Sequence, residues 1–266
     1  MALPAWTCTI DRIDYQDAAR LQRSLRAARE AGEIPDTVLI LEHDPVITTG
    51  HRTEMHEVAH ALTSGIPVVP TERGGKATWH GPGQVVAYPI LDLTRHGSDI
   101  RAYVCALEQA VIDTCAEFGI EASRRDGLPG VWIAPGSDEL FEGRNIVGAV
   151  AAPHRKIASI GVRVTRWVSF HGVALNSHCS LDGFAQFTPC GIGDVRMTSI
   201  VRELNGAAPS LASVREAFTA HLHAALGISC TSVPASRLYE IAERFHVPAP
   251  ELASVGGRAA TEGALQ

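Results

Sequence analysis

Residues 73–84 read RGGKATWHGPGQ, a run in which glycine and proline alternate with the large side chains Arg73, Lys76, Trp79 and His80. An ordinary tight turn needs only one or two glycines or prolines. Glycine also lets the backbone approach another molecule closely, because it has no side chain. We therefore interpret this run as a surface where main chain and polar side chains close around a group that is not protein.

A second candidate is Cys190, which lies in FTPCGIGD between a proline and a glycine. Proline restrains the backbone before the thiol, and glycine frees the backbone after it. The amides of 191–193 could then turn toward a bound oxyanion. A lone cysteine is, however, commonly a small buried apolar residue. The residues alone leave both a nucleophile and a structural thiol open.

A third candidate is Lys156, near the start of RKIASIGVRV (155–164). In a strand, Lys156 would share one face with Ala158, Ile160 and Val162, because side chains alternate between faces. A lysine on such a face either reaches water from the strand end or is a buried functional amine. The residues alone favour the first interpretation.

Residues 56–60 read HEVAH, which matches the HExxH pattern of zinc hydrolases. The preceding residues include the charged Glu54 and give little apolar lead-in for a buried helix. The chain also holds 12 histidines, so a chance match is common. We expect an exposed helical turn here and keep a zinc hydrolase as the alternative.

The composition excludes several other classes. The chain has 266 residues, 45% of them hydrophobic, which is enough for a proper core. Its formal net charge is -6, which argues against nucleic acid as a partner. The six cysteines are scattered, so we expect neither a disulfide framework nor a structural zinc site. No secretory signal or membrane-spanning stretch is evident, and we expect a soluble cytoplasmic protein that does not bind membranes.

Hydrophobic periodicity predicts both helices and strands. Helices are expected over 15–30, 101–118 and 210–226, and strands over 37–43, 66–69, 84–90, 130–133, 145–152, 155–164 and 167–176. The order does not alternate strictly, so we predict an α/β (α+β) fold with a mixed β-sheet flanked by helices.

The expected domain organisation has two parts. Residues 1–230 form a catalytic domain, and residues 231–266 form a C-terminal extension. Beyond about Val247 the sequence is rich in proline, alanine, glycine and serine. The extension is therefore expected to be partly disordered.

These motifs occur together and in one order, and in this the sequence resembles the lipoyl(octanoyl) transferases. The resemblance covers about two-thirds of the chain and rests on LILEHDPVITTG (39–50), RGGKATWHGPGQVVAYPILDL, RKIASIGVRV, SFHGVALN, TPCGI and TSI. It implies a fold like that of biotin and lipoate protein ligases, with a mixed sheet flanked by helices.

The resemblance also implies an activity and its residues. An octanoyl (or lipoyl) group would pass from acyl carrier protein, through a thioester on Cys190, to a lysine of an acceptor protein. The donor of the octanoyl group would be octanoyl-acyl carrier protein. The acceptors would be lipoyl domains of 2-oxoacid dehydrogenase complexes and the glycine cleavage H protein, with no cofactor and no metal. Lys156 aligns with the partner of the cysteine. Substrate-binding positions align with Arg73, Gly74, Gly75, Lys76, Ala77, Thr78, Trp79, His80, Ser159, Ile160, Gly161, Gly172, Val173 and Ala174.

On this hypothesis the glycines of the 73–84 run let the backbone close around an acyl chain, while Arg73 and His80 hold its polar end. Two features depart from the family pattern: the segment 134–154 is longer than usual, and Lys76 replaces a polar uncharged residue. An ATP-dependent ligase of lipoate or biotin type is the nearest rival. A module that only holds acylated carrier protein is another.

Overall fold

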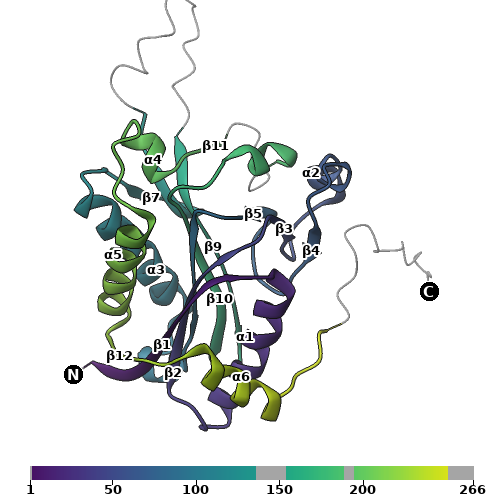
Figure 1. The fold of residues 1–266 in the computed structure, drawn as a ribbon, viewed down its shortest axis with the longest axis vertical. Helices are drawn as coiled ribbons and strands as arrows, with labels where there is room; N and C mark the ends of the chain where they lie inside the picture. The colour runs from purple at the N-terminus through teal and green to yellow at the C-terminus, as the bar shows by residue number, and fades with distance from the viewer. Residues whose placement is uncertain (1, 136–153, 189–194, 251–266) are drawn as a thin grey trace, which may run out of the picture.

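The computed structural model describes residues 2–135, 154–188 and 195–250. Within them, a nine-stranded sheet follows the order β12-β1-β2-β6-β10-β9-β8-β7, and β11 pairs with β9 (Figure 1). Strand β1 is parallel to both β12 and β2, and β11 is parallel to β9. The other neighbouring strands, from β2 through β6, β10, β9 and β8 to β7, pair antiparallel. The strands are β1 (Leu3–Ile13), β2 (Asp36–His43), β6 (Gln84–Ile90), β7 (Ser123–Arg125), β8 (Leu128–Ile133), β9 (Arg155–Thr165), β10 (Val168–Asn176), β11 (Arg196–Met197) and β12 (Ile228–Ser232).

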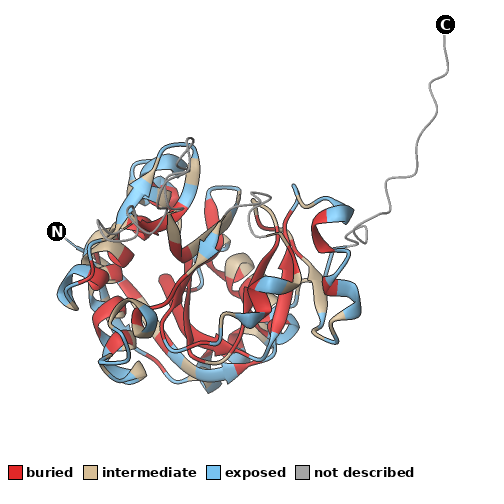
Figure 2. Ribbon diagram, turned by 90° about the horizontal axis from the view of Figure 1, so that it is seen from above, coloured by how far each residue is buried: buried red, intermediate tan, exposed pale blue. Residues whose placement is uncertain are grey.

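Helices cover both faces of this sheet. Alternate residues of β2 point to opposite faces, with Val38 and Ile40 in one core cluster and Leu39 and Leu41 in the other. The helices α3 (Ile100–Glu117) and α5 (Leu211–Leu226) pack on the first face, and α1 (Tyr15–Glu30) and α6 (Ala235–Arg244) on the second (Figure 1). Because both faces are covered, β2, β6 and β10 are buried at every position, as the red central strands in Figure 2 show.

A smaller sheet lies beside the large one, in the order β4 (Val68–Pro70), β3 (Val46–Thr49) and β5 (Thr78–His80). It packs with the short elements α2 (Met55–Val58), η1 (Ala61–Thr63) and η3 (Asp182–Gln186) around a third apolar cluster. The remaining short elements are η2 (Leu93–His96) and α4 (Ile200–Glu203). The small sheet carries residues 73–80 across the large sheet, and so positions the candidate site.

The predicted mixed sheet flanked by helices is confirmed. Helix α1 has the predicted bounds, because Asp14 caps it by accepting hydrogen bonds from the amides of Gln16 (2.8 Å) and Asp17 (3.2 Å). The strands β1, β12, β3 and β5 were not predicted. None of the helices in the described part of the chain is long and apolar enough to cross a membrane.

The expected boundary at residue 230 falls inside β12, which pairs with β1. Beyond it, α6 packs against α1 through Leu238 and Ile241, which are buried in the second core cluster. At least the first part of the expected extension therefore contributes to the core. Residues 251–266 and the strand expected over 145–152 lie outside the described residues.

Candidate active site

A cavity of about 380 Å³ runs along β9 and β10 beneath the glycine-rich run. Most of the residues named from the sequence border this space together, although they come from three separate segments. Those that line it are Arg73, Gly74, Gly75, Lys76, Ala77, Thr78, His80, Lys156, Ser159, Ile160, Gly161, Gly172, Val173 and Ala174. The β9–β10 register explains part of this grouping, because Gly161 lies opposite Gly172 and Ile160 opposite Val173.

The side chain of Arg73 holds the glycine-rich run in shape. Its Nη2 donates to the carbonyl (2.7 Å) and hydroxyl (2.8 Å) of Thr48, and its Nη1 donates to the carbonyls of Lys76 (2.7 Å) and Gly74 (3.1 Å). The amide of Gly74 donates to the carbonyl of Val162 at 3.0 Å, which ties the run to β9. These contacts give Arg73 a structural task that the sequence did not indicate.

His80 begins a chain of hydrogen bonds that ends at the backbone carbonyl of Lys156. The side-chain amide of Gln84 donates to Asn176 (2.9 Å), so its oxygen accepts from Nδ1 of His80 (2.8 Å). Asn176 donates to the carbonyl of Thr198 (3.0 Å), whose amide donates to the carbonyl of Lys156 (2.9 Å). The assignment leaves Nε2 of His80 as an acceptor, and burial holds the pKa of His80 well below its ordinary value. His80 is therefore neutral at physiological pH.

Lys156 is buried, with 3% of its surface exposed. Its Nζ donates to the carbonyl of Pro129 at 2.9 Å and lies 5.0 Å from the centre of the Trp132 ring. Gly130, at φ +124°, makes room for it, because a Cβ there would lie 2.5 Å from Cε of Lys156. The sequence-based preference for a lysine reaching water from the strand end is wrong. Lys156 presents a buried amine beside the cavity.

Aromatic and histidine side chains border the cavity away from Lys156. His171 is 3% exposed, and neither of its ring nitrogens has a hydrogen-bond partner among the described residues. Burial, with Arg73 nearby, lowers the pKa of His171 to about 3, and burial raises the pKa of Tyr15 to about 12. His171 also holds a left-handed φ of 57° within a strand, a conformation that non-glycine residues rarely adopt. Both groups are neutral at pH 7.

The sequence analysis missed several residues that border the cavity. Val86 and Tyr88 are two residues apart on β6, which the sequence predicts as a strand. The sequence therefore indicated that they share one face of the strand, but not that this face borders the cavity. His171 lies in the SFHGVALN motif, which carried the family resemblance but gave this histidine no function. Tyr15 carried no signal beyond its position at the start of a helix. The missed lining residues are Tyr15, Arg52, Val86, Tyr88, Val104, Gly127, Leu128, Pro129, Trp132, Val162 and His171.

Two named residues do not line the described cavity. Trp79 lies between Thr78 and His80 on β5, so its side chain points the other way and packs with Phe184, the two ring centres lying 5.5 Å apart. Cys190 lies outside the described residues, as do most of the residues of 134–154. The described chain stops at Thr188 and resumes at Val195.

The HEVAH segment does not have the form of a zinc-binding helix. Helix α2 ends at Val58, so His60 is not on it, and Glu57 is 4% exposed. The expectation of an exposed turn is therefore wrong for Glu57. Its carboxylate is paired with the Lys76 ammonium and accepts from the amide of Glu54 (2.9 Å). Across the described ranges, no group of three or more His, Cys, Asp or Glu side chains could hold a metal ion.

Comparison with known families agrees with this fold. The family described as lipoyl protein ligase A/B catalytic domain matches residues 14–223. The chain therefore belongs to this family.

Among curated relatives, the octanoyltransferase of Mycobacterium leprae (strain Br4923) is 46% identical over 228 residues, which cover 84% of this chain and 90% of the relative. The octanoyltransferase of Mycobacterium tuberculosis (strain ATCC 25618 / H37Rv) is 46% identical over 214 residues, covering 80% and 84%. The resemblance to the lipoyl(octanoyl) transferases is thus confirmed.

Solved structures show the same fold at low identity. A structure from an archaeal lipoylation system, described as a bi-partite lipoate protein ligase and its E2 lipoyl domain from Thermoplasma acidophilum, aligns with a TM-score of 0.64 and 15% identity, covering 91% of each chain. A lipoate-protein ligase A bound with ATP aligns with a TM-score of 0.60 and 15% identity, covering 90% of this chain and 93% of that one. The expected likeness to lipoate protein ligases is confirmed for the fold.

Proposed function

We propose that this protein is an acyltransferase that moves an octanoyl or lipoyl group from acyl carrier protein to a lysine of a lipoate-dependent enzyme domain. Cys190 carries the acyl group as a thioester. Lys156 donates a proton in the first half-reaction and accepts one in the second. The observation that carries the proposal is the buried amine of Lys156 beside a cavity that the segments 73–80, 159–161 and 172–174 border together. The names of the relatives, octanoyltransferases, support the octanoyl group.

The cavity suits a medium-length acyl chain. Its volume of about 380 Å³ lies at the lower end of the range for small-molecule sites. Apolar side chains of Val86, Val104, Leu128, Ile160 and Val173 line it. Burying about seven methylenes contributes roughly 5–6 kcal/mol, at ~0.8 kcal/mol each. Binding energy of this size lets the depth of the cavity select chain length.

In the first half-reaction, the Cys190 thiolate attacks the carbonyl carbon of the carrier thioester. A new S–C bond forms, the old S–C bond breaks, and the carrier leaves as a thiolate that takes a proton from the Lys156 ammonium. Acylation removes the negative charge of Cys190, and the proton given to the carrier thiolate removes the positive charge of Lys156. Lys156 therefore stays neutral in the acyl-enzyme.

In the second half-reaction, the acceptor lysine attacks the Cys190 thioester. Neutralising a free lysine of pKa ~10.4 at pH 7 requires about 4.6 kcal/mol, which is the larger obstacle of the two steps. Neutral Lys156 removes a proton from the attacking nitrogen, the amide bond forms, and Cys190 leaves as a thiolate. The ammonium and the thiolate are thereby restored. The proposed acceptors are lipoyl domains of 2-oxoacid dehydrogenase complexes and the glycine cleavage H protein.

The test is intact-protein mass spectrometry after incubation with octanoyl-acyl carrier protein, without ATP. We expect one octanoyl adduct on the wild-type chain and none on Cys190→Ala. An adduct on Cys190→Ala would mean that the nucleophile lies elsewhere. Wild-type transfer that depends on ATP would instead favour the ligase alternative.

The role of Lys156 is tested on the isolated acyl-enzyme. Lys156→Met should slow transfer to a lipoyl domain by about 10²–10⁴-fold, because general-base catalysis is lost. A transfer rate equal to that of the wild type would exclude the proposed proton cycle.

A further inference from the structure

Glu57 joins two parts of the candidate site that are far apart in the sequence. Its Oε1 accepts from the Lys76 ammonium, in the glycine-rich run. Its backbone carbonyl accepts from the amide of Thr188 at 2.9 Å, two residues before Cys190. One buried residue thus contacts both the loop over the cavity and the segment that leads to the proposed nucleophile.

Neighbouring backbone contacts strengthen the first of these links. The amide of Arg52 donates to the carbonyl of Gly75 (3.1 Å), and the amide of His51 donates to the carbonyl of Arg73 (3.3 Å). Residues 51–57 therefore hold the first part of the glycine-rich run, at Arg73, Gly75 and Lys76. Glu57 extends this contact to Thr188.

Apolar packing joins the same three segments. Val58 follows Glu57 and belongs to the third apolar cluster, together with Ala77 and Trp79 of the glycine-rich run. Phe187, next to Thr188, belongs to the same cluster. A shift of α2 would therefore disturb both the run and the approach to Cys190, because close-packed side chains transmit displacement.

The charge on Glu57 is maintained although the side chain is buried. Burial alone would raise the pKa of Glu57, but the Glu54 amide and the Lys76 ammonium hold it below its ordinary value. Salt screens a buried pair much less than a pair on the surface. Only the Glu57 side of the pair is buried, because the Lys76 side chain is 28% exposed. Removing Lys76 leaves the Glu57 carboxylate buried and without its cation, so the ion pair constrains Glu57 locally.

We propose that Glu57 is a positioning residue for acyl transfer. Through its contacts with Lys76 and Thr188, it fixes the glycine-rich run relative to the segment that leads to Cys190, the proposed nucleophile. This inference rests on the proposed function for the chemistry that it positions. It also gives a task to the HEVAH segment, and it explains why a lysine at position 76 is useful in this chain.

The experiment compares Lys76→Met, Glu57→Gln and the double variant with the wild type. The first readout is the single-turnover rate of acyl-enzyme formation at saturating octanoyl-acyl carrier protein. We expect each single variant to be about 10–100-fold slower, since misplacements near 1 Å have effects of this size. The double variant should be no slower than the worse single variant, because both remove one interaction. Additive losses would overturn the proposal.

The second readout is the rate of hydrogen–deuterium exchange at Thr188. If Lys76 only contacted the substrate, its substitution would not change this rate. Lys76→Met leaves Glu57 itself unsubstituted, so it still tests the proposal if Glu57→Gln does not fold. In Lys76→Met the peptide containing Thr188 should exchange faster than in the wild type, because the Glu57 side chain is no longer held by the Lys76 ammonium. Faster exchange confined to 73–80, or unchanged rates, would overturn the inference.

Arg20→Met is the matched control, because it breaks an exposed ion pair with Asp17 on α1. It should leave both readouts at wild-type values. If the wild type itself forms no acyl-enzyme, the proposed function fails, while the exchange readout still decides whether Glu57 couples the two segments.

Discussion

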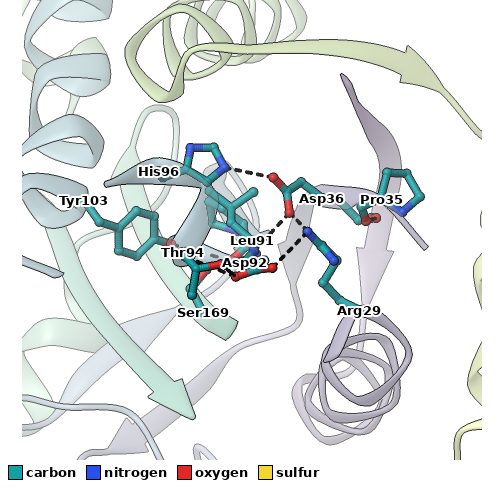
Figure 3. Close-up of polar contacts among 11 residues, drawn as sticks. Arg29, Pro35, Asp36, Leu91, Asp92, Thr94, His96, Tyr103 and Ser169 are labelled. Atoms are coloured by element: carbon teal, nitrogen blue, oxygen red, sulfur yellow. Dashed lines mark hydrogen bonds and ion pairs between the residues drawn. The ribbon is translucent and has the colours of Figure 1, made fainter. Parts of the chain in front are cut away.

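Two buried polar clusters of this protein differ in how their hydrogen bonds are completed. Around Asp36, Oδ1 accepts from Nε of Arg29 (2.7 Å) and the amide of Asp92 (3.0 Å), and Oδ2 is 2.8 Å from Nε2 of His96 (Figure 3). Around the cavity, both ring nitrogens of His171 have no partner among the described residues. In the cluster around Asp36, the carboxylate finds its hydrogen-bond partners within the protein. At the cavity, the ring nitrogens of His171 are left for a ligand to bind.

The two clusters also differ in charge. Burial would raise the pKa of Asp36, but hydrogen bonds from His96 and Arg29 hold it below its ordinary value, so the cluster around Asp36 is ionic. Burial lowers the pKa of His171 to about 3 and holds the pKa of His80 well below its ordinary value, so the two histidines that line the cavity are neutral. Neutral histidines add no charge beside an apolar chain, so the charge at the cavity comes from other lining residues, among them Arg73 and Lys76. Substitutions in the two regions should therefore have separable effects on stability and activity.

The largest expected effect is on stability, from Asp36→Ala. This change leaves the 8%-exposed guanidinium of Arg29 without its 2.7 Å partner, and Asp92 at 3.4 Å cannot replace it fully. Breaking one side of a buried pair costs about 3–5 kcal/mol. Urea unfolding should show this loss, while the rate per folded molecule stays at the wild-type value.

Asp17→Ala is the control, because Asp17 pairs with Arg20 on α1, the helix that also carries Arg29, and this pair is half exposed. Its effect on the free energy of unfolding should be below about 1 kcal/mol. A loss as large as that of Asp36→Ala would show that burial is not what distinguishes the cluster around Asp36.

A smaller effect, on activity, is expected from Gly130→Ala. The added Cβ would meet Cε of Lys156 at 2.5 Å and the carbonyl of Ala158 at 2.6 Å. The flexible lysine side chain can move away, but its amine then leaves Pro129. We expect transfer from the acyl-enzyme to fall by about 10–100-fold. Single-turnover transfer to a lipoyl domain measures this.

Gly127→Ala is the control for backbone strain, since Gly127 also has a left-handed φ (73°) and no atom lies within 4 Å of its Cβ position. If both variants lose the same activity, strain in the β7–β8 connection explains the effect and crowding of Lys156 does not.

The sequence predicted the elements that have strong periodicity. Helices α1 and α3 and strands β2, β6 and β10 have clear apolar patterns, and their bounds agree with the prediction to within one residue. Strand β1 was missed because its residues alternate irregularly between buried and exposed positions. Short strands such as β5 were missed because their pairing is set by distant segments, which local pattern does not record.

The candidate site was readable only through the glycine-rich run and the family resemblance. Periodicity could not show that Arg73 binds main-chain carbonyls, or that Glu57 is buried, because both depend on contacts across the fold. The burial of Lys156 depends on Pro129 and Trp132, which reach it from the neighbouring strand β8. Tertiary contacts of this kind decide which of several chemically plausible roles a side chain has.

The smallest expected effect is on the pH dependence of stability. Because the pKa of His171 is about 3 when folded and ~6.5 when unfolded, the unfolded chain binds one more proton between these values. The free energy of unfolding should therefore fall as pH decreases from 6.5, by up to about 1.4 kcal/mol per pH unit for this histidine. His171→Asn should remove this contribution, and asparagine tolerates the left-handed φ of 57°. Urea unfolding at pH 7, 6 and 5 gives the slope, with His56→Asn, whose side chain is 76% exposed, as the matched control. Equal slopes for His171→Asn and the wild type would mean that His171 takes up its proton over the same pH range in the folded and unfolded protein, and the contrast between an ionic cluster and neutral cavity histidines would no longer hold.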